Sequence, residues 1–382
     1  MSAESCGHAT MAGPALGVPG GRRWGRDAVL VGWVVLVATV VAAALNLLVP
    51  PDSVWHVSDH WITLLGKIMC YAICALALDM IWGYSGILSL GHGLFFALGG
   101  YVMGMYLMRQ IGTDGNYGSE LPDFMVFLDW KELPWHWALS DSFAATLLLI
   151  VLVPGLLAWV FGYFAFRSRI QGVYFSIITQ ALTFAAMLLF YRNETGFGGN
   201  NGFTDFKRIV GFPITASETR VALLALTGLA LVGCYAVSRW LVGSKFGRVL
   251  QAIRDAESRV MFCGYDPLSY KLAVWTLSAI MCAVAGALYV PQVGIINPRE
   301  MSPAASIEIA VWVAVGGRGT LVGPLVGAFA VNGAKSWLTV LAPEVWLYVL
   351  GALFVAVTLW MPDGLVGLAR RWAQRLLGGR QP

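Results

Sequence analysis

The chain has 382 residues, of which 58% are hydrophobic and 12% are charged, and its formal net charge is +4 at pH 7. Soluble globular proteins carry about 25% charged residues, so this composition excludes that class. A membrane-spanning helix needs about 20 apolar residues, and a chain of this length holds about ten of them with their connections. We therefore expect an all-α polytopic membrane protein with about ten transmembrane helices.

Charge placement orients the expected spans. Residues 1–27 are rich in glycine, proline and alanine, and we expect a disordered tail there. Arginines precede the first span and recur in residues 362–382, and the positive-inside rule places both termini in the cytoplasm. The transmembrane domain is then 28–361. The apolar runs that we expect to cross are 28–49, 61–82, 94–111, 142–166, 172–191, 220–242, 272–294, 306–315, 321–341 and 345–361, of which 306–315 is the shortest.

Two connections are expected on the outer side. The loop 112–141 has six carboxylates against the single cation Lys131, and the loop 193–206 is rich in glycine and asparagine. Both follow spans that leave the cytoplasm, so a soluble partner on the outside would meet them first. The residues that we select as candidate contacts for such a partner are Asp123, Gly199, Asn200 and Asn201.

The segment 243–270 is the longest hydrophilic stretch in the second half of the chain and is expected in the cytoplasm. Val249, Ile253, Ala256 and Val260 recur at helical spacing and predict an amphipathic helix with one apolar stripe. Arg254 is placed to reach Glu257 at i,i+3. From the residues alone, this helix either rests on anionic lipid or docks a soluble partner. The candidate docking residues are Ile253, Arg254, Asp255, Glu257 and Gly264, with Arg254, Asp255 and Glu257 facing the partner.

Glycines interrupt the apolar pattern at two places, 83–93 and 316–321, and both begin with the pattern G-x-x-G-x-L. Transporters are often built with interrupted helices near the substrate path. His92 lies in the first break, where a neutral imidazole that satisfies freed backbone groups is favoured over a transport ligand. The candidate path residues are Gly83, Gly86, Gly91, His92, Gln180 and Asn332. The charged residues expected at membrane depth are Lys67, Asp79, Glu308, Arg318 and Lys335.

The chain contains no nucleotide-binding or hydrolase motif of the kinds recognised by spacing, and its six cysteines show no metal-binding spacing. We therefore expect a protein that is not an enzyme, with no metal, no cofactor and no nucleic-acid partner. Any ATP hydrolysis would belong to separate subunits.

Three segments carry a family resemblance. IWGYSGILSLGHGLFFALGGYVMGMYL, GRVLQAIRDAESRVMFCGYDPLSYKLAVWTLSAIMCAVAGALY and GGRGTLVGPLVGAF resemble, in this order, the permease subunits of branched-chain amino acid ABC importers. The outer segments LPDFMVFLDWKELPWHW and RNETGFGGNNGFTDF are similar to the urea-importing branch. The resemblance implies a bacterial inner-membrane location, a second homologous permease subunit, two ATPase subunits and a periplasmic solute-binding protein. It identifies 243–270 as the ATPase-coupling loop.

The function that we expect is therefore alternating-access import of urea or short amides, with branched-chain amino acids as the alternative. A stand-alone channel or an ion-coupled carrier is the rival class. Such a carrier should show carboxylates near the membrane midplane, whereas the two expected at membrane depth, Asp79 and Glu308, lie off-centre in their runs. A structural membrane scaffold would explain neither the broken helices nor the outer loops.

Overall fold

The computed structural model describes residues 21–50, 52–170, 172–360 and 363–378. The N-terminal tail expected over residues 1–27 therefore lies mostly outside the described residues, and the first helix begins at Gly21. The longer helices are α1 Gly21–Leu47, α2 Asp59–Ser85, α3 His92–Arg109, α5 Phe143–Arg167, α6 Val173–Phe190, α7 Ser217–Gly243, α8 Lys245–Phe262, α9 Pro267–Val293, α10 Pro303–Gly316, α11 Val322–Leu341, α12 Trp346–Trp360 and α13 Gly364–Gly378.

The remaining elements are short and lie in the connections. They are the helix α4 Asp123–Phe127, the 3-10 turns η1 Gly112–Asp114, η2 Trp135–Trp137, η3 Asn193–Thr195 and η4 Pro298–Met301, and the strands β1 Phe203–Thr204, β2 Arg208–Ile209, β3 Phe212–Pro213 and β4 Ile295–Ile296. Strand β1 pairs antiparallel with β4, and β2 pairs antiparallel with β3. Each pair is a separate two-stranded sheet within the connections.

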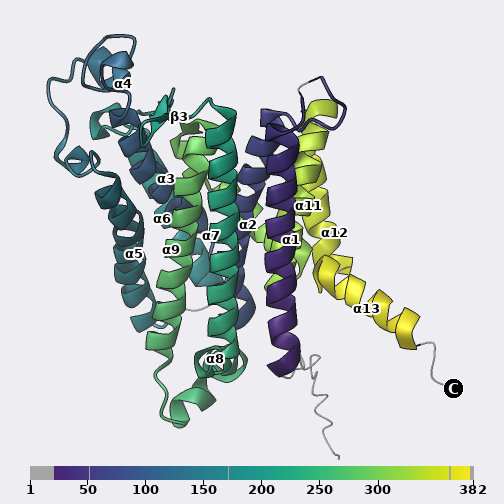
Figure 1. The fold of residues 1–382 in the computed structure, drawn as a ribbon. Helices are drawn as coiled ribbons and strands as arrows, with labels where there is room; N and C mark the ends of the chain where they lie inside the picture. The colour runs from purple at the N-terminus through teal and green to yellow at the C-terminus, as the bar shows by residue number, and fades with distance from the viewer. Residues whose placement is uncertain (1–20, 51, 171, 361–362, 379–382) are drawn as a thin grey trace, which may run out of the picture.

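The molecule is an all-α polytopic bundle, as the sequence predicts. Within the described residues, six helices are long and apolar enough to cross a membrane, namely α1, α2, α5, α6, α7 and α9. Figure 1 shows these helices running side by side. Helices α2 and α9 are the most deeply buried of the six and pack against each other and against α3, while α1, α5 and α6 expose most of their apolar side chains. The core is therefore built on α2, α3 and α9.

The two ends of the bundle carry different elements. Helix α4, the hairpin β2–β3 and the turn between α1 and α2 lie at one end, whereas α8, α13 and the start of α1 lie at the other end (Figure 1). This relative placement confirms that the loops 112–141 and 193–206 share one side and that 243–270 lies on the opposite side. We refer below to the outer end and the cytoplasmic end, in accordance with the charge distribution.

Two membrane crossings are interrupted, one entered from the cytoplasmic end and the other from the outer end. After α2 ends at the cytoplasmic end, residues 86–91 run without helix into the bundle, and α3 begins inside it. After α9 ends at the outer end, β4 and η4 run into the bundle, and α10 begins beside α3, where the Gly93 N–H donates to Ser306 Oγ at 3.2 Å. The shortest expected span is therefore half a helix, because the 14 residues of α10 reach only about 21 Å.

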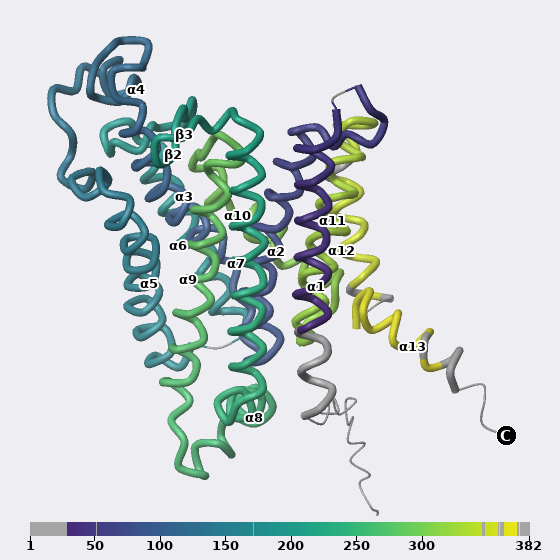
Figure 2. The backbone as a smooth tube through the Cα atoms, viewed as in Figure 1, coloured from purple at the N-terminus to yellow at the C-terminus, as the bar shows by residue number. Residues whose placement is uncertain are grey.

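Helix α10 lies in the middle of the bundle and packs against α2, α3 and α11 (Figure 2). The N-termini of the half-helices α3 and α10 thus meet inside the protein. Irregular backbone is tolerated at membrane depth only where protein or a cavity satisfies its polar groups. The two breaks therefore mark the interior region in which a transport path has to be sought.

Candidate functional site

Helix α8 is amphipathic, as predicted, but it is not continuous. Ser244 caps its start, with Oγ accepting from the Phe246 N–H at 3.1 Å. The backbone of Ala256 leaves the helical region, with φ −158° and ψ 75°, so the element is two short helices joined by a kink. Ile253 and Val260 of the predicted apolar stripe are buried against the bundle. The stripe therefore fixes which side of α8 faces the membrane domain.

Arg254 and Glu257 of α8 contact the bundle, whereas we expected both side chains to face a soluble partner. Arg254 Nη1 donates to the backbone oxygen of Gly83 at the end of α2, at 2.7 Å. Glu257 pairs with Lys271 of α9 at 2.6 Å, and the Lys271 side chain is only 8% exposed. Arg254 and Glu257 thus each have a partner on a neighbouring helix, and the kink at Ala256 lies between them in the chain. Asp255 is exposed and is the member of the three that faces solvent.

Asp255 and Gly264 define the exposed face of the coupling segment. Asp255 makes a 2.9 Å pair with Arg254 Nε, and its side chain remains 67% exposed. Gly264 has φ +84°, and a side chain built there would meet nothing within 4 Å. A soluble partner that approaches the cytoplasmic end can therefore reach these two positions without moving any other group.

The two glycine breaks, 83–93 and 316–321, meet at the cytoplasmic end, next to Arg254. A Cβ built on Gly83 would lie 2.5 Å from the backbone nitrogen of Gly319, so only glycine permits this approach. Asp79, fully buried, accepts from the Gly319 N–H at 2.5 Å and from the Leu321 N–H at 3.3 Å. Asp79 therefore joins α2 to the loop between α10 and α11.

Gly86 completes this arrangement. Its φ of +74° caps α2, and a Cβ there would lie 2.7 Å from Arg254 Cγ. We call the set Asp79, Gly83, Gly86, Arg254 and Gly319 the glycine junction. It connects α8 to α2 and to the α10–α11 loop through hydrogen bonds to backbone groups. Gly83 and Gly86, which we selected as path residues, thus belong to the contact between the coupling segment and the bundle.

His92 and Gly91 lie deeper, where α3 begins. His92 Nε2 is 2.6 Å from Ser278 Oγ, and Nδ1 is 3.2 Å from Ser89 Oγ. Because Ser278 Oγ donates to the Ala77 oxygen at 2.8 Å, it must accept from His92, which assigns the proton of the neutral ring to Nε2. The imidazole thus links α2, α3 and α9 through serine hydroxyls, whereas we expected it to bond freed backbone groups.

Gly91, Gln180 and Asn332 are the remaining path candidates. A Cβ on Gly91 would lie 3.1 Å from Thr179 Cβ of α6, and Gln180, the residue after Thr179, is half-buried. Asn332 is buried on α11, where its Nδ2 donates to the Ala328 oxygen at 2.9 Å. Gly91 and His92 thus lie together at the start of α3, beside the part of α6 that carries Gln180.

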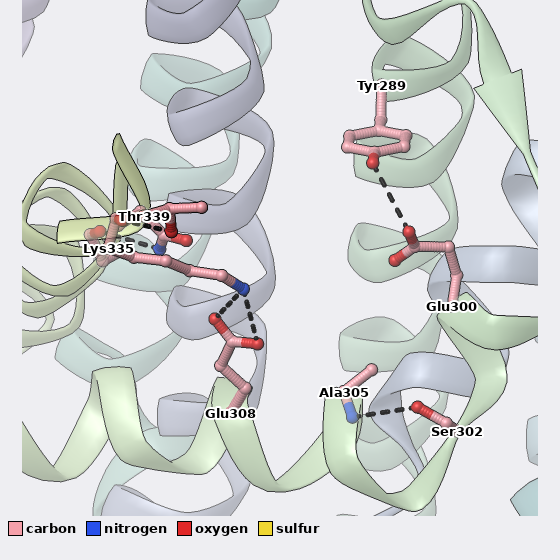
Figure 3. A network of polar contacts seen from close by, with 9 residues as sticks. Tyr289, Glu300, Ser302, Ala305, Glu308, Lys335 and Thr339 are labelled. Carbon is pink, nitrogen blue, oxygen red and sulfur yellow. Dashed lines mark hydrogen bonds and ion pairs between the residues drawn. The ribbon is translucent and has the colours of Figure 1, made fainter. Parts of the chain in front are cut away.

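A network of charged and polar side chains occupies the interior beside the start of α10 (Figure 3). Lys335 of α11 donates to both oxygens of Glu308, at 2.7 and 3.0 Å, and Tyr289 donates to Glu300 at 3.4 Å. Figure 3 shows the Lys335 ammonium and the Glu300 carboxylate pointing toward the same gap. The Lys67 ammonium lies 5.8 Å from the ring centre of Tyr71.

Glu300 was missed by the sequence analysis. Asn297, Pro298 and Pro303 predict an outer turn, and nothing in the pattern indicates that this turn enters the bundle. In the structure Glu300 and Glu308 line one cavity of about 30 Å³, together with the start of α3 and residues of α2. That volume holds about one water molecule, so a solute path through it is closed in this conformation.

Two of the four predicted outer contacts lie together. Asp123 and Asn201 line the same cavity of about 380 Å³, although they come from different loops. Trp137 is buried between those loops and donates from Nε1 to the Gly196 oxygen at 3.2 Å. Asn200 is exposed, and Gly199 is buried with φ +54°. Burial partly desolvates His136, next to Trp137, and lowers its pKa.

Among the described residues, no group of three or more histidine, cysteine or acidic side chains could hold a metal ion. The geometry consists of broken crossings, an interior polar network and a coupling segment at one end. These features define a membrane transport subunit.

Comparison with known proteins identifies the family. Residues 61–358 match the family described as branched-chain amino acid transport system / permease component, and the chain belongs to this family. It is 25% identical to the high-affinity branched-chain amino acid transport system permease protein LivM of Escherichia coli (strain K12), over 79% of this chain and 69% of that protein. No solved structure matches the chain.

Two further relatives show the breadth of the family. The probable branched-chain amino acid transport permease protein LivM of Methanocaldococcus jannaschii is 25% identical over 78% of this chain and 90% of its own length. The autoinducer 2 import system permease protein LsrC of Yersinia pseudotuberculosis is 27% identical over 55% of this chain and 59% of its own length. The chain is thus a multi-pass inner-membrane permease subunit of an ABC importer. The relatives favour branched-chain amino acids over urea, which the outer segments suggested.

Proposed function

We propose that this chain is one of two homologous membrane subunits of an ABC importer for branched-chain amino acids. A periplasmic binding protein delivers the solute to the outer end, and two separate ATPase subunits act on α8. The match over residues 61–358 carries this proposal, together with the names of the relatives. The residues for binding-protein contact are Asp123, Gly199, Asn200 and Asn201 at the outer surface.

The glycine junction supports a specific route for coupling. A force applied to the exposed face of α8, at Asp255, is transmitted by Arg254 to the Gly83 carbonyl of α2. Asp79, on the same helix, transmits it to Gly319 in the α10–α11 loop. Helices α2 and α10 both line the interior cavity, through Tyr71 and Glu308. Movement of the junction therefore displaces two walls of the cavity together, which is what alternating access requires.

The interior network suits a zwitterionic solute better than an uncharged one. A charge at membrane depth costs about 2.5–3.5 kcal/mol on insertion scales, so charges retained there have a partner or a function. Lys335 and Glu308 form a pair with each other, while Lys67 and Glu300 form no ion pair among the described residues. An amino acid presents an ammonium to a carboxylate such as Glu300 and a carboxylate to an ammonium such as Lys67. Urea has no charge to offer either group.

Uptake by the reconstituted importer tests the proposal. Proteoliposomes that contain both membrane subunits and both ATPases are given the binding protein with radiolabelled leucine or urea, with and without ATP. ATP-dependent uptake of leucine without uptake of urea is expected. ATP-dependent uptake of urea alone would replace the proposed substrate by the one that the outer segments resemble. Uptake that does not require ATP would instead indicate a channel or an ion-coupled carrier.

A further inference from the structure

A third cavity, larger than the two described above, lies at the cytoplasmic end, and its lining includes Gly83, Gly86 and Arg254 of the glycine junction. It measures about 680 Å³ and is enclosed by the end of α2, α8, the α10–α11 loop and α13. Its charged lining consists of four arginines and one carboxylate, namely Arg254, Arg318, Arg370, Arg371 and Asp363. Guanidinium groups in such excess are typical of sites that bind phosphate, because the planar fork donates two parallel hydrogen bonds.

Two of the four guanidinium groups already have a carboxylate partner. Arg371 forms an ion pair with Asp363, which is the one carboxylate of the lining, and Arg254 forms one with Asp255. Arg318 lies over the ring of Trp82 with 5.8 Å between its Cζ and the ring centre. Arg370 is exposed and takes part in no ion pair among the described residues. At least two guanidinium groups, on Arg318 and Arg370, are therefore available to an anion that enters the cavity.

Helix α13 places the mouth of this cavity at the membrane surface. Its sequence, GLVGLARRWAQRLLG, is amphipathic, and Leu368 and Trp372 are 40% and 61% exposed. Figure 1 shows α13 running outward from the bundle at the cytoplasmic end. A helix with exposed apolar residues beside arginines lies in the interface plane, with its apolar face among the acyl chains. Trp82, in the wall of the cavity, is a residue type that favours the same depth.

The cavity and the exposed face of α8 present different groups. Arg254 donates to the Gly83 carbonyl of α2 and pairs through Nε with Asp255, whose side chain is 67% exposed. A soluble partner that docks on α8 meets Asp255, whereas Arg318 and Arg370 belong to the α10–α11 loop and to α13. The cytoplasmic leaflet is rich in anionic headgroups, and α13 carries both Arg370 and the exposed apolar side chains that suit the acyl chains.

We propose that this cavity binds the phosphate of an anionic phospholipid from the cytoplasmic leaflet. The headgroup enters between α13 and the α10–α11 loop, its phosphate contacts Arg318 and Arg370, and its acyl chains lie against Leu368 and Trp372. This site does not depend on which solute the importer carries. Its test can therefore succeed or fail independently of the proposed transport function.

Lipid binding to the purified full-length chain tests the site. Native mass spectrometry measures retention of dioctanoyl phosphatidylglycerol and of dioctanoyl phosphatidylcholine, as a zwitterionic comparison. Each arginine near the surface contributes about 5-fold to binding of anionic lipid, so Arg318→Gln/Arg370→Gln should weaken phosphatidylglycerol binding roughly 30-fold and leave phosphatidylcholine unchanged. The matched control, Arg167→Gln/Arg248→Gln, removes the same charge outside the cavity and should bind as the wild type does.

Four results would overturn the proposal. They are unchanged phosphatidylglycerol binding in the cavity variant, an equal loss in the control, displacement of the lipid by inorganic phosphate at equal concentration, and a cavity variant that loses ATPase binding while it keeps the lipid. An equal loss in the control would mean that net charge alone attracts the lipid. Displacement by inorganic phosphate would mean that the cavity binds a soluble anion. If the double variant does not insert, Arg370→Gln alone carries the test, with an expected loss of about 5-fold, because Arg370 makes no ion pair with any residue that the structure describes.

Discussion

The hydrogen bond from Arg254 to Gly83 is the contact whose loss should separate ATP hydrolysis from transport. In Arg254→Met the stem that packs on Gly86 is kept, and the guanidinium is removed. A hydrogen bond from a charged donor contributes about 1.5–3 kcal/mol, whereas the pair with Asp255, which is 67% exposed, contributes at most about 1 kcal/mol. The carbonyl contact therefore dominates. Loss of this hydrogen bond should raise the fraction of molecules in which α8 is released from α2 by about 10- to 150-fold.

The assay compares leucine uptake with ATP hydrolysis in the same proteoliposomes. Arg254→Met should insert normally and hydrolyse ATP, yet move far less solute for each ATP consumed. Arg248→Met is the control, because Arg248 lies on the exposed side of the same helix. If Arg254→Met keeps the wild-type ratio of transport to hydrolysis, the glycine junction does not transmit the motion of α8.

Three further predictions follow from other contacts. Glu257→Lys should lower the yield of inserted protein, because it places a second cation beside the nearly buried Lys271, and Glu257→Lys/Lys271→Glu should restore the yield. His92→Leu should lower the melting temperature of the purified protein, because loss of the imidazole leaves buried hydroxyls unpaired at a cost of about 1–3 kcal/mol, and His92→Gln should lower it less. Because burial lowers the pKa of His136, the unfolded outer loop takes up the proton first, so the loop's stability is full above about pH 6.5 and falls below it. Hydrogen exchange at pH 7.5 and 5.5 checks this, and His136→Asn should remove the difference.

The spans were predictable because each depends on local composition. An apolar run of sufficient length predicts a helix wherever it lies, and the bounds of α2, α7 and α9 lie within a few residues of those expected. The direction of Arg254 was not predictable. Its acceptor, the Gly83 carbonyl, lies 171 residues away in the sequence. The kink at Ala256 was not predictable either, because alanine is the strongest helix former.

The interior site was predictable only in part. Glycines at 83, 86 and 319 indicated interrupted helices, but their meeting at one junction depends on contacts across more than 200 residues of sequence. Glu300 looked like part of a polar turn, since local pattern does not reveal that a turn enters the bundle. Lys335 and Glu308 are on different helices, and their pairing depends on how α10 and α11 pack.

Photo-crosslinking from α8 tests the central claim, that this helix is the surface on which the ATPases act, most directly. p-Benzoylphenylalanine replaces the exposed Asp255 in the assembled importer, and the same residue replaces the exposed Phe127 at the outer end as a control. If α8 is that surface, a crosslink to an ATPase subunit forms from position 255 and none forms from position 127. A crosslink to the ATPase from position 127, with none from position 255, would refute this role of α8.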